Sequence, residues 1–237
     1  MLLLRSILFA LGMWCSIVVF AILALFTAPF PFSVRYGFIS QWARLNLWWL
    51  ALTCGVRYQI EGRENIPQGN AIVMSKHQST WETLALQVIF PPQVWVMKRE
   101  LLRVPFFGWG LALLEPIALD RKARGKARQQ LIEQGVQRLE SGRWVVIFPE
   151  GTRIPPGEKG RYALGGALLA QESGYPVVPM AHNAGEFWPR RQFIKKPGTI
   201  QVRIGPAIES QGKSAQEINQ AVEAWIEGQM EEITFKR

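Results

Sequence analysis

One uninterrupted apolar segment near the N-terminus limits what this chain can fold into more than any other feature. No charged side chain lies between Arg5 and Arg35, and residues 7–26 read ILFALGMWCSIVVFAILALF. As an α-helix, this run would be about 30 Å long, which is the thickness of a hydrocarbon core. A cleaved signal peptide has a shorter apolar region of about 7 to 15 residues and a small-residue cleavage site. The segment therefore predicts an uncleaved membrane helix.

A second apolar segment, residues 36–54, follows Pro31 and differs in character from the first. It contains three tryptophans and is interrupted by polar residues such as Arg44 and Asn46. Tryptophan at headgroup depth in a mixed apolar and polar helix is typical of the membrane interface. A helix packed against a folded domain fits the same pattern. The sequence leaves open whether this segment crosses, re-enters or lies on the bilayer.

The chain divides by composition into two parts. Residues 1–54 contain no Asp or Glu and form the predicted N-terminal membrane anchor, with a membrane helix at about 7–26 and an interfacial helix at about 36–54. Residues 55–237 have the composition of a globular domain. The whole chain has 27 Lys and Arg against 18 Asp and Glu, a net charge of +9. Because basic residues favour the cytoplasmic side, we expect the domain to face the cytoplasm from the inner membrane.

Composition excludes several other classes of protein. The 49% apolar content excludes a disordered chain, and two cysteines are too few for a disulfide scaffold or a four-thiolate zinc site. The two histidines, His77 and His182, have no Cys or paired His beside them, so we expect no bound metal. Five basic residues within 121–128 suit nucleic acid, anionic lipid, an acidic carrier protein or simply a solvated helix face. No nucleic-acid-binding motif accompanies them, so we expect no nucleic-acid partner.

From Gly55 onward, short apolar runs alternate with segments of helical periodicity. We expect strands at 57–61, 71–75, 94–98, 116–119, 144–148, 177–181 and 200–204. We expect helices at 80–89, 124–139, 162–171 and 215–230. Strands that alternate with helices predict an α/β domain with a mostly parallel central sheet flanked by helices.

A histidine and a carboxylate follow one of the predicted strands. Residues 75–82, SKHQSTWE, lead from this strand into a helix, and ligands of α/β sheets bind at the carboxyl ends of strands. With His77 in the turn and Glu82 in the first helical turn, the two side chains can meet. Glu82 would then fix one imidazole tautomer and leave the other nitrogen as a general base. Ser79-Thr80-Trp81-Glu82 also reads as a helix capping box, which is a purely structural role for Glu82.

A second constellation follows another predicted strand. Residues 148–153 read FPEGTR, in which Gly151 permits close ligand approach, Thr152 adds a hydroxyl and Arg153 offers a planar fork for phosphate oxygens. Arg121 lies just after the strand 116–119, with Asp120 between them. Two arginines at neighbouring strand ends would form a phosphate clamp.

Taken together, these segments resemble the 1-acyl-sn-glycerol-3-phosphate acyltransferase family, over nearly the whole chain. The matching segments, in order, are His77 to Glu82 (the family's His-x4-Asp), 98–108 (KRELLRVPFFG), IALDR ending at Arg121, FPEGTR at 148–153, and PVVP at 176–179. Two departures stand out. Glu82 replaces the usual Asp, and residues 163–167 lack a Lys that many relatives carry, for which Lys159 or Arg161 are possible substitutes.

The resemblance implies direct acyl transfer. His77 would take the proton from the free 2-hydroxyl of lysophosphatidic acid as that oxygen attacks an acyl thioester, and Glu82 would hold His77. The substrate-binding residues that it implies are Arg121, Glu150, Gly151, Thr152 and Arg153. Lys98 is a further candidate, for the phosphate or the developing oxyanion, unless it is only a solvated charge.

The expected product is phosphatidic acid, made for phospholipid synthesis at a membrane bilayer. No cofactor is expected, because the acyl group arrives on acyl-CoA or on acyl carrier protein as co-substrate. The sequence does not choose between these donors, nor does it give the acyl-chain length or the oligomeric state. Alternatives are an acyltransferase for another lysolipid, including an amino-acid lipid, and a non-catalytic lipid-binding membrane protein.

Overall fold

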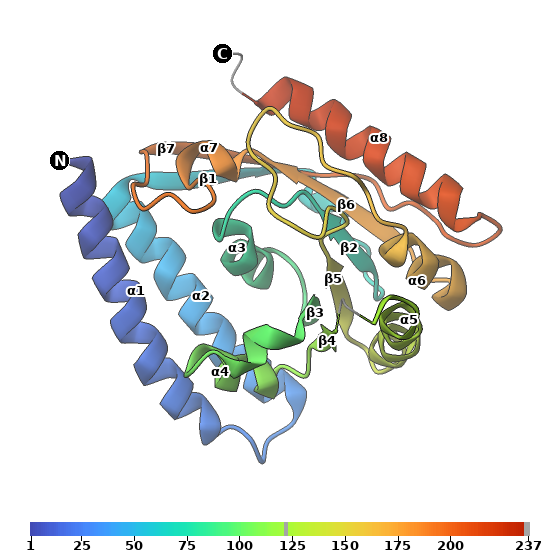
Figure 1. Cartoon of the computed structure of the whole chain (residues 1–237), viewed down its shortest axis with the longest axis horizontal. Helices are drawn as coiled ribbons and strands as arrows, with labels where there is room; N and C mark the ends of the chain where they lie inside the picture. Colours follow the sequence, from blue (N-terminus) through green and yellow to red (C-terminus); the bar gives the residue numbers. More distant parts are fainter. Residues whose placement is uncertain (121–122, 235–237) are drawn as a thin grey trace.

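The structure is a computed structural model that describes residues 1–120 and 123–234. Within these residues, a seven-stranded sheet has the strand order β1-β7-β6-β2-β5-β3-β4 (Figure 1). The strands are β1 (Val56–Glu61), β2 (Ile72–Ser75), β3 (Gln93–Lys98), β4 (Ile117–Leu119), β5 (Trp144–Ile147), β6 (Val177–His182) and β7 (Gly198–Ile204). Neighbouring strands are parallel except for β6 and β7, which are antiparallel. The predicted α/β fold with a mostly parallel sheet is therefore confirmed.

Helices cover both faces of the sheet and give the fold three layers. The helices are α1 (Leu2–Leu25), α2 (Phe32–Cys54), α3 (Trp81–Ile89), α4 (Phe107–Leu113), α5 (Arg124–Glu140), α6 (Gly165–Ser173), α7 (Ala184–Phe187) and α8 (Ala215–Ile233), with short 3-10 turns at Arg63–Asn65 and Arg99–Arg103. Side chains alternate across β2, so Val73 joins a core with α1, α2, α3 and α7, whereas Ile72 and Met74 join a core with α5, α6 and α8. The central strands are thus buried on both sides, as parallel strands usually are.

The two N-terminal helices form an antiparallel hairpin along one side of the molecule (Figure 1). Helix α2 starts after Pro31 and ends at Gly55, whose φ of +69° supplies the left-handed residue that commonly terminates a helix. By its length and composition, helix α1 could cross a membrane. Of the residues in its apolar stretch, 22% are buried inside the structure. Its outer side chains are exposed, among them Leu11 and Trp14. Helix α1 is therefore a candidate membrane anchor.

Helix α2 has one buried side and one side with exposed apolar residues. One face, including Ala43, Leu47 and Leu50, is buried in the core with α3 and the sheet. The opposite side exposes Trp48 and Leu52, each at 59%. The helix is therefore packed on the domain and also presents apolar residues outward.

Candidate active site

Two loops meet at the carboxyl ends of neighbouring parallel strands. Strand β2 leads into residues 76–80, strand β5 leads into the FPEGTR segment, and β2 pairs directly with β5. The backbone of His77 is held on both sides by this second loop: its N–H donates to Glu150 Oε2 at 2.8 Å, and its carbonyl accepts from the N–H of Ile154 at 2.8 Å. The structure therefore brings together the two constellations that the sequence placed at strand ends.

The predicted contact between His77 and Glu82 is present. Nδ1 of His77 lies 2.8 Å from Oε1 of Glu82, which is the second residue of α3. The same Oε1 accepts the backbone N–H groups of Gln78 at 2.8 Å and Ser79 at 2.7 Å. The carboxylate thus contacts the imidazole and makes one of the two bonds of the predicted capping box. In place of the reciprocal bond from the Glu82 N–H, Ser79 Oγ accepts from the N–H of Trp81.

The surroundings of His77 fix its ring and leave one nitrogen available. The ring stacks on Phe148 with 3.9 Å between centroids and 13° between planes. Because the ionised carboxylate only accepts, Nδ1 carries the proton and Nε2 is the basic nitrogen. Nε2 has no hydrogen-bond partner within the described part of the chain, and the His77 side chain is 14% exposed. This is the arrangement of a general base that is open to a substrate hydroxyl.

Glu82 stays ionised although it is completely buried. Burial by itself would raise the pKa of Glu82, but His182, His77 and the Ser79 N–H outweigh burial and lower the pKa below its ordinary value. His182 is equally buried, and burial lowers its pKa. His182 lies with Nε2 2.9 Å from the carbonyl of Lys76, and its Nδ1 accepts from Ala184 N–H. His182 therefore packs behind the pair, with both ring nitrogens bonded to backbone groups.

Behind the His77 loop lies a buried ionic network that the sequence did not predict. Lys76 is 1% exposed, and its Nζ lies 2.8 Å from Glu150 Oε1 and 2.8 Å from Glu227 Oε1 of α8. The Tyr162 hydroxyl donates to Glu227 at 2.7 Å. Burial raises the pKa of Glu150, against the opposing effects of Lys76 and the His77 N–H. The carboxylate of Glu150, expected to bind substrate, is thus enclosed by protein groups.

The end of the FPEGTR loop is more open. Gly151 has a φ of +63°, which favours glycine, and Thr152 is exposed. Arg153 is half-buried. Burial and the like charge of Arg190 lower the pKa of Arg153, while Glu82 raises it. The guanidinium of Arg153 nevertheless remains charged. Arg190, in the loop after α7, donates from Nη1 to the Arg153 carbonyl at 2.9 Å. A second guanidinium therefore lies close to Arg153, and no motif in the sequence indicated it.

The remaining basic candidates occupy other places. Lys98 ends β3, which is the neighbour of β5, and its side chain is exposed. Arg121 lies outside the described residues. The strand before it, β4, is separated from β5 by β3, so the prediction that the two arginines follow neighbouring strands is wrong. Lys159, a possible substitute for the missing lysine, instead forms an exposed ion pair with Glu223 of α8 at 2.8 Å. Arg161 is exposed as well.

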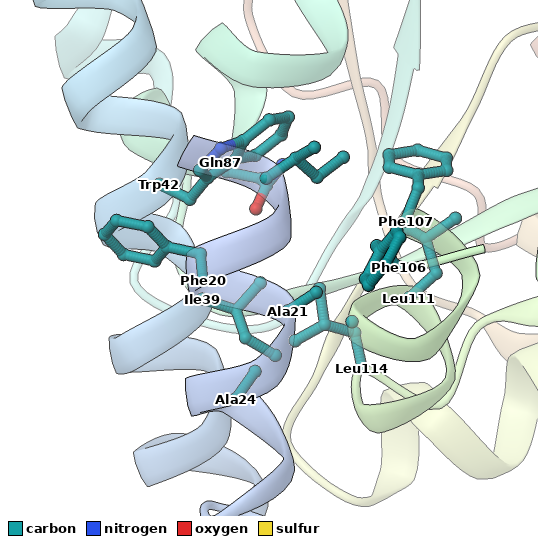
Figure 2. Close-up of a pocket in the computed structure, with 12 residues that line it drawn as sticks. Phe20, Ala21, Ala24, Ile39, Trp42, Gln87, Phe106, Phe107, Leu111 and Leu114 are labelled. Atoms are coloured by element: carbon teal, nitrogen blue, oxygen red, sulfur yellow. The ribbon is translucent and has the colours of Figure 1, made fainter. Parts of the chain in front are cut away.

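An apolar cavity lies between α1, α2 and α4. It has a volume of about 50 Å³, and Figure 2 shows aromatic and aliphatic side chains pointing into it from these helices. Its lining residues are Ile17, Phe20, Ala21, Ala24, Ile39, Trp42, Gln87, Phe106, Phe107, Gly110, Leu111 and Leu114. Gln87 comes from α3, the helix that starts beside His77. Its apolar lining suits hydrocarbon groups, but its volume lies below the roughly 300–1,000 Å³ of ligand pockets, so it takes a short apolar group and not a whole acyl chain.

Among the described residues, no group of three or more His, Cys, Asp or Glu side chains could hold a metal ion. The basic residues near His77 could instead hold an anionic substrate, since guanidinium groups match phosphate oxygens.

Comparison with known proteins identifies the family of the chain. Residues 57–183 match the family model described as acyltransferase. A protein of Pseudomonas aeruginosa named 1-acyl-sn-glycerol-3-phosphate acyltransferase is 49% identical over 97% of this chain and 91% of its own length. A Saccharomyces cerevisiae protein of the same name is 30% identical. The match covers 78% of this chain and 63% of the yeast protein. A crystal structure of the Thermotoga maritima 1-acyl-sn-glycerophosphate acyltransferase, 24% identical, shares the fold with a TM-score of 0.81 and covers 99% of this chain and 98% of that one.

The fold, the histidine–carboxylate pair and the family match define an acyltransferase. More narrowly, the chain belongs to the family of 1-acyl-sn-glycerol-3-phosphate acyltransferases, as its motifs predicted.

Proposed function

We propose that this protein transfers a fatty acyl group from an acyl thioester to the 2-hydroxyl of 1-acyl-sn-glycerol 3-phosphate, which gives phosphatidic acid. The observation that carries this proposal is the 2.8 Å contact between His77 Nδ1 and Glu82 Oε1, with Nε2 left open beside the FPEGTR loop. The relatives that bear this activity in their names support it.

The reaction follows from the geometry in two proton transfers. His77 Nε2 removes the hydroxyl proton as the oxygen attacks the thioester carbonyl, and Glu82 stabilises the resulting imidazolium. Collapse of the tetrahedral intermediate breaks the carbon–sulfur bond, and the imidazolium returns its proton to the leaving thiolate. The products are the new ester and a free thiol, so His77 ends in its starting state.

Substrate binding is divided among the polar and apolar parts of the site. We assign the phosphate to Arg153 with Thr152 and the Gly151 backbone, with Arg121 and Lys98 as further contacts. Arg190 joins this group because it lies against Arg153. Glu150 has the different task of holding the His77 backbone, since a carboxylate directed at the phosphate would repel it.

The cellular setting follows from the chemistry and the N-terminal helices. The apolar cavity between α1, α2 and α4 would take a short part of an acyl chain. Helix α1 anchors the protein in the inner membrane, where lysophosphatidic acid resides, and the basic surface favours the cytoplasmic face, where acyl-CoA or acyl carrier protein is available. The reaction needs no metal or cofactor, because His77 handles both protons.

The test is release of free thiol from an acyl-CoA and, separately, from an acyl carrier protein thioester. The acceptors are lysophosphatidic acid, glycerol 3-phosphate, lysophosphatidylcholine, lysophosphatidylethanolamine and an amino-acid lysolipid. We expect turnover to be strongest with lysophosphatidic acid and to fall by about 10²–10⁴ in His77→Ala. Turnover that prefers another acceptor would replace the proposed substrate, and full activity in His77→Ala would refute the general base.

A further inference from the structure

The loop between α7 and β7, residues 188–197, carries two adjacent apolar side chains in a basic setting. Phe193 is 49% exposed and Ile194 is 40% exposed. Four basic residues flank this pair: Arg190, Arg191, Lys195 and Lys196. Single exposed apolar residues are ordinary, but an exposed apolar pair framed by cations is the composition of a segment that lies at a lipid interface.

This 188–197 loop is fixed to the start of α1. Trp188 packs edge-to-face on Phe9 of α1, with 5.2 Å between ring centroids and 87° between planes. The backbone N–H of Lys195 donates to Ser6 Oγ at 2.9 Å. In Figure 1 the loop, in orange, lies near the N-terminal end of α1. The loop is therefore held in place rather than free to fold back over its apolar residues.

An inward-pointing lysine sets the position of Phe193. The Lys195 ammonium lies 4.9 Å from the centroid of the Phe193 ring and 5.1 Å from that of Trp188, and it donates to the Phe193 carbonyl at 2.7 Å. These cation–π contacts and the hydrogen bond hold the exposed ring against the body of the protein. Arg191 and Lys196 are exposed and remain directed to the solvent side of the loop.

Next to the loop, α1 presents apolar side chains of its own. The exposed residues in its first three turns are Leu2, Leu3, Leu4, Ile7, Leu8 and Leu11. Because Ser6 and Phe9 touch the loop, the Phe193–Ile194 pair lies beside the part of α1 that carries these exposed side chains. This region is continuous with the candidate membrane anchor and carries positive charge at its edge.

We propose that the 188–197 loop docks on an anionic phospholipid membrane surface. Phe193 and Ile194 enter the boundary between headgroups and acyl chains, and Arg191 and Lys196 bind headgroup phosphates. The loop thereby forms a second membrane contact, separate in sequence from α1.

The consequence for catalysis rests on the proposed function. Arg190 of the loop donates to the Arg153 carbonyl, and the Ser79 hydroxyl donates to the Trp188 carbonyl at 2.6 Å. Both the FPEGTR loop and the start of α3 are therefore tied to the docking loop. Docking would hold Arg153 and Arg190, the arginines assigned to the substrate phosphate, at the depth of the lipid headgroups. A lysophospholipid in the membrane has its phosphate at that depth.

Site-directed spin labelling of the full-length protein tests the docking without any need for turnover. The background is Cys15→Ser, because Cys15 is exposed whereas Cys54 is buried. Labels go at Phe193→Cys, at Leu8→Cys as the lipid-exposed reference and at Gln211→Cys as the exposed aqueous reference. In phosphatidylglycerol vesicles, collision rates with oxygen and with a water-soluble nickel complex report the depth of each label.

We expect the label at 193 to behave as the label at 8 does, with high oxygen and low nickel accessibility. Accessibility equal to that at 211 would overturn the proposal. Arg191→Gln and Lys196→Gln should each lower the ratio of docked to undocked loop by about fivefold. Equal docking on phosphatidylcholine vesicles would overturn the anionic specificity.

A kinetic experiment tests the consequence separately. Phe193→Ser/Ile194→Ser should raise the KM for long-chain lysophosphatidic acid in vesicles by about tenfold, because the buried apolar contact is lost. Turnover of a short-chain, water-soluble lysophosphatidic acid should be unchanged. An unchanged vesicle KM would refute the catalytic consequence, while absence of turnover in wild-type protein would refute the proposed function and leave the labelling result intact.

Discussion

Glu82 serves as more than a partner for His77, because a single oxygen of its carboxylate accepts three hydrogen bonds. Oε1 accepts from His77 Nδ1 and from the backbone N–H groups of Gln78 and Ser79. These donors converge because α3 begins directly after the His77 turn, so its first residues point back toward that turn. The side chain that orients the imidazole therefore also fixes the backbone on which the imidazole sits.

This coupling predicts that stability depends on acid pH through Glu82. Its pKa is lowered below the ordinary 4.5 in the folded protein, and a group of this kind stabilises the fold above its unfolded-state pKa. That contribution is lost as the pH falls through the folded-state pKa. The excess unfolding free energy of wild type over Glu82→Gln should be constant above about pH 5 and shrink below it, as measured by denaturant titration. A constant difference down to about pH 3 would contradict the ionised state.

Arg153 is predicted to act on one substrate only. Arg153→Ala should raise the KM for lysophosphatidic acid by about 10- to 100-fold, because a charged hydrogen bond to phosphate is lost, while the KM for the thioester changes little. Arg63→Ala, which removes an exposed arginine from a distant turn, serves as the control. Steady-state kinetics with each substrate varied in turn measures both constants. Equal changes in both would argue against a phosphate contact.

At the scale of elements, one buried lysine joins three parts of the chain. Lys76 precedes the His77 turn, Glu150 belongs to the loop after β5, and Glu227 belongs to α8. Helix α8 covers the face of the sheet opposite α3, yet Glu227 reaches the catalytic side through this network. The position of His77 therefore depends on a helix that is distant from it in sequence.

Lys76→Met is expected to destabilise the protein by about 3–5 kcal/mol, because two carboxylates lose their shared cation in a buried site. The matched control is Lys159→Met, which breaks an ion pair with Glu223 of the same helix and should cost much less, because solvent screens that exposed pair. Denaturant unfolding of both variants in detergent gives the comparison. Equal stability of the two variants would show that the buried network contributes no more than a surface pair.

The sequence predicts those elements whose pattern is local. The seven strands and helices α3, α5, α6 and α8 lie where apolar runs and helical periodicity indicate. The contact between His77 and Glu82 is predictable because both residues sit at one strand–helix junction. The short helices α4 and α7 are not predictable, since seven and four residues give too little periodicity.

Long-range partners escape prediction for a different reason. In the sequence, Glu227 is an ordinary acidic residue on an amphipathic helix, and Arg190 is an ordinary basic residue in a loop. Only the fold brings Glu227 to Lys76 and Arg190 to Arg153. The enclosure of Glu150 likewise depends on Lys76 and on the packing of α8. Such roles are set by tertiary contacts between residues more than 35 positions apart, which no local pattern encodes.

At the scale of the whole molecule, the N-terminal helices and the sheet share a single core. Phe9 of α1 and Leu50 of α2 are completely buried in the same cluster as Ile200 of β7. Arg5 donates to the Thr53 carbonyl, and the loop before β7 binds Ser6. The division into an anchor of residues 1–54 and a domain of residues 55–237 describes composition, whereas packing unites the two.

This shared core predicts that the anchor cannot be removed to give a soluble enzyme. A chain that starts at Gly55 would expose the apolar sides of α3 and β1 that α2 now covers. We expect that chain to aggregate without detergent and to lack a cooperative thermal transition in detergent, as followed by circular dichroism. A monomeric, folded and active product would show instead that residues 1–54 form an independent anchor.

A point variant tests the same packing in the intact chain. A side chain at Gly12 of α1 would clash with the indole of Trp49 on α2, whereas one at Gly37 of α2 meets nothing within 4 Å. Gly12→Val should therefore lower the melting temperature of the entire protein, because separating the hairpin opens the common core, and Gly37→Val should not. Both place the same β-branched residue in a helix, so the difference between them isolates the contact. If Gly12→Val left the single transition unchanged, the hairpin would contribute nothing to the stability of the sheet beneath it.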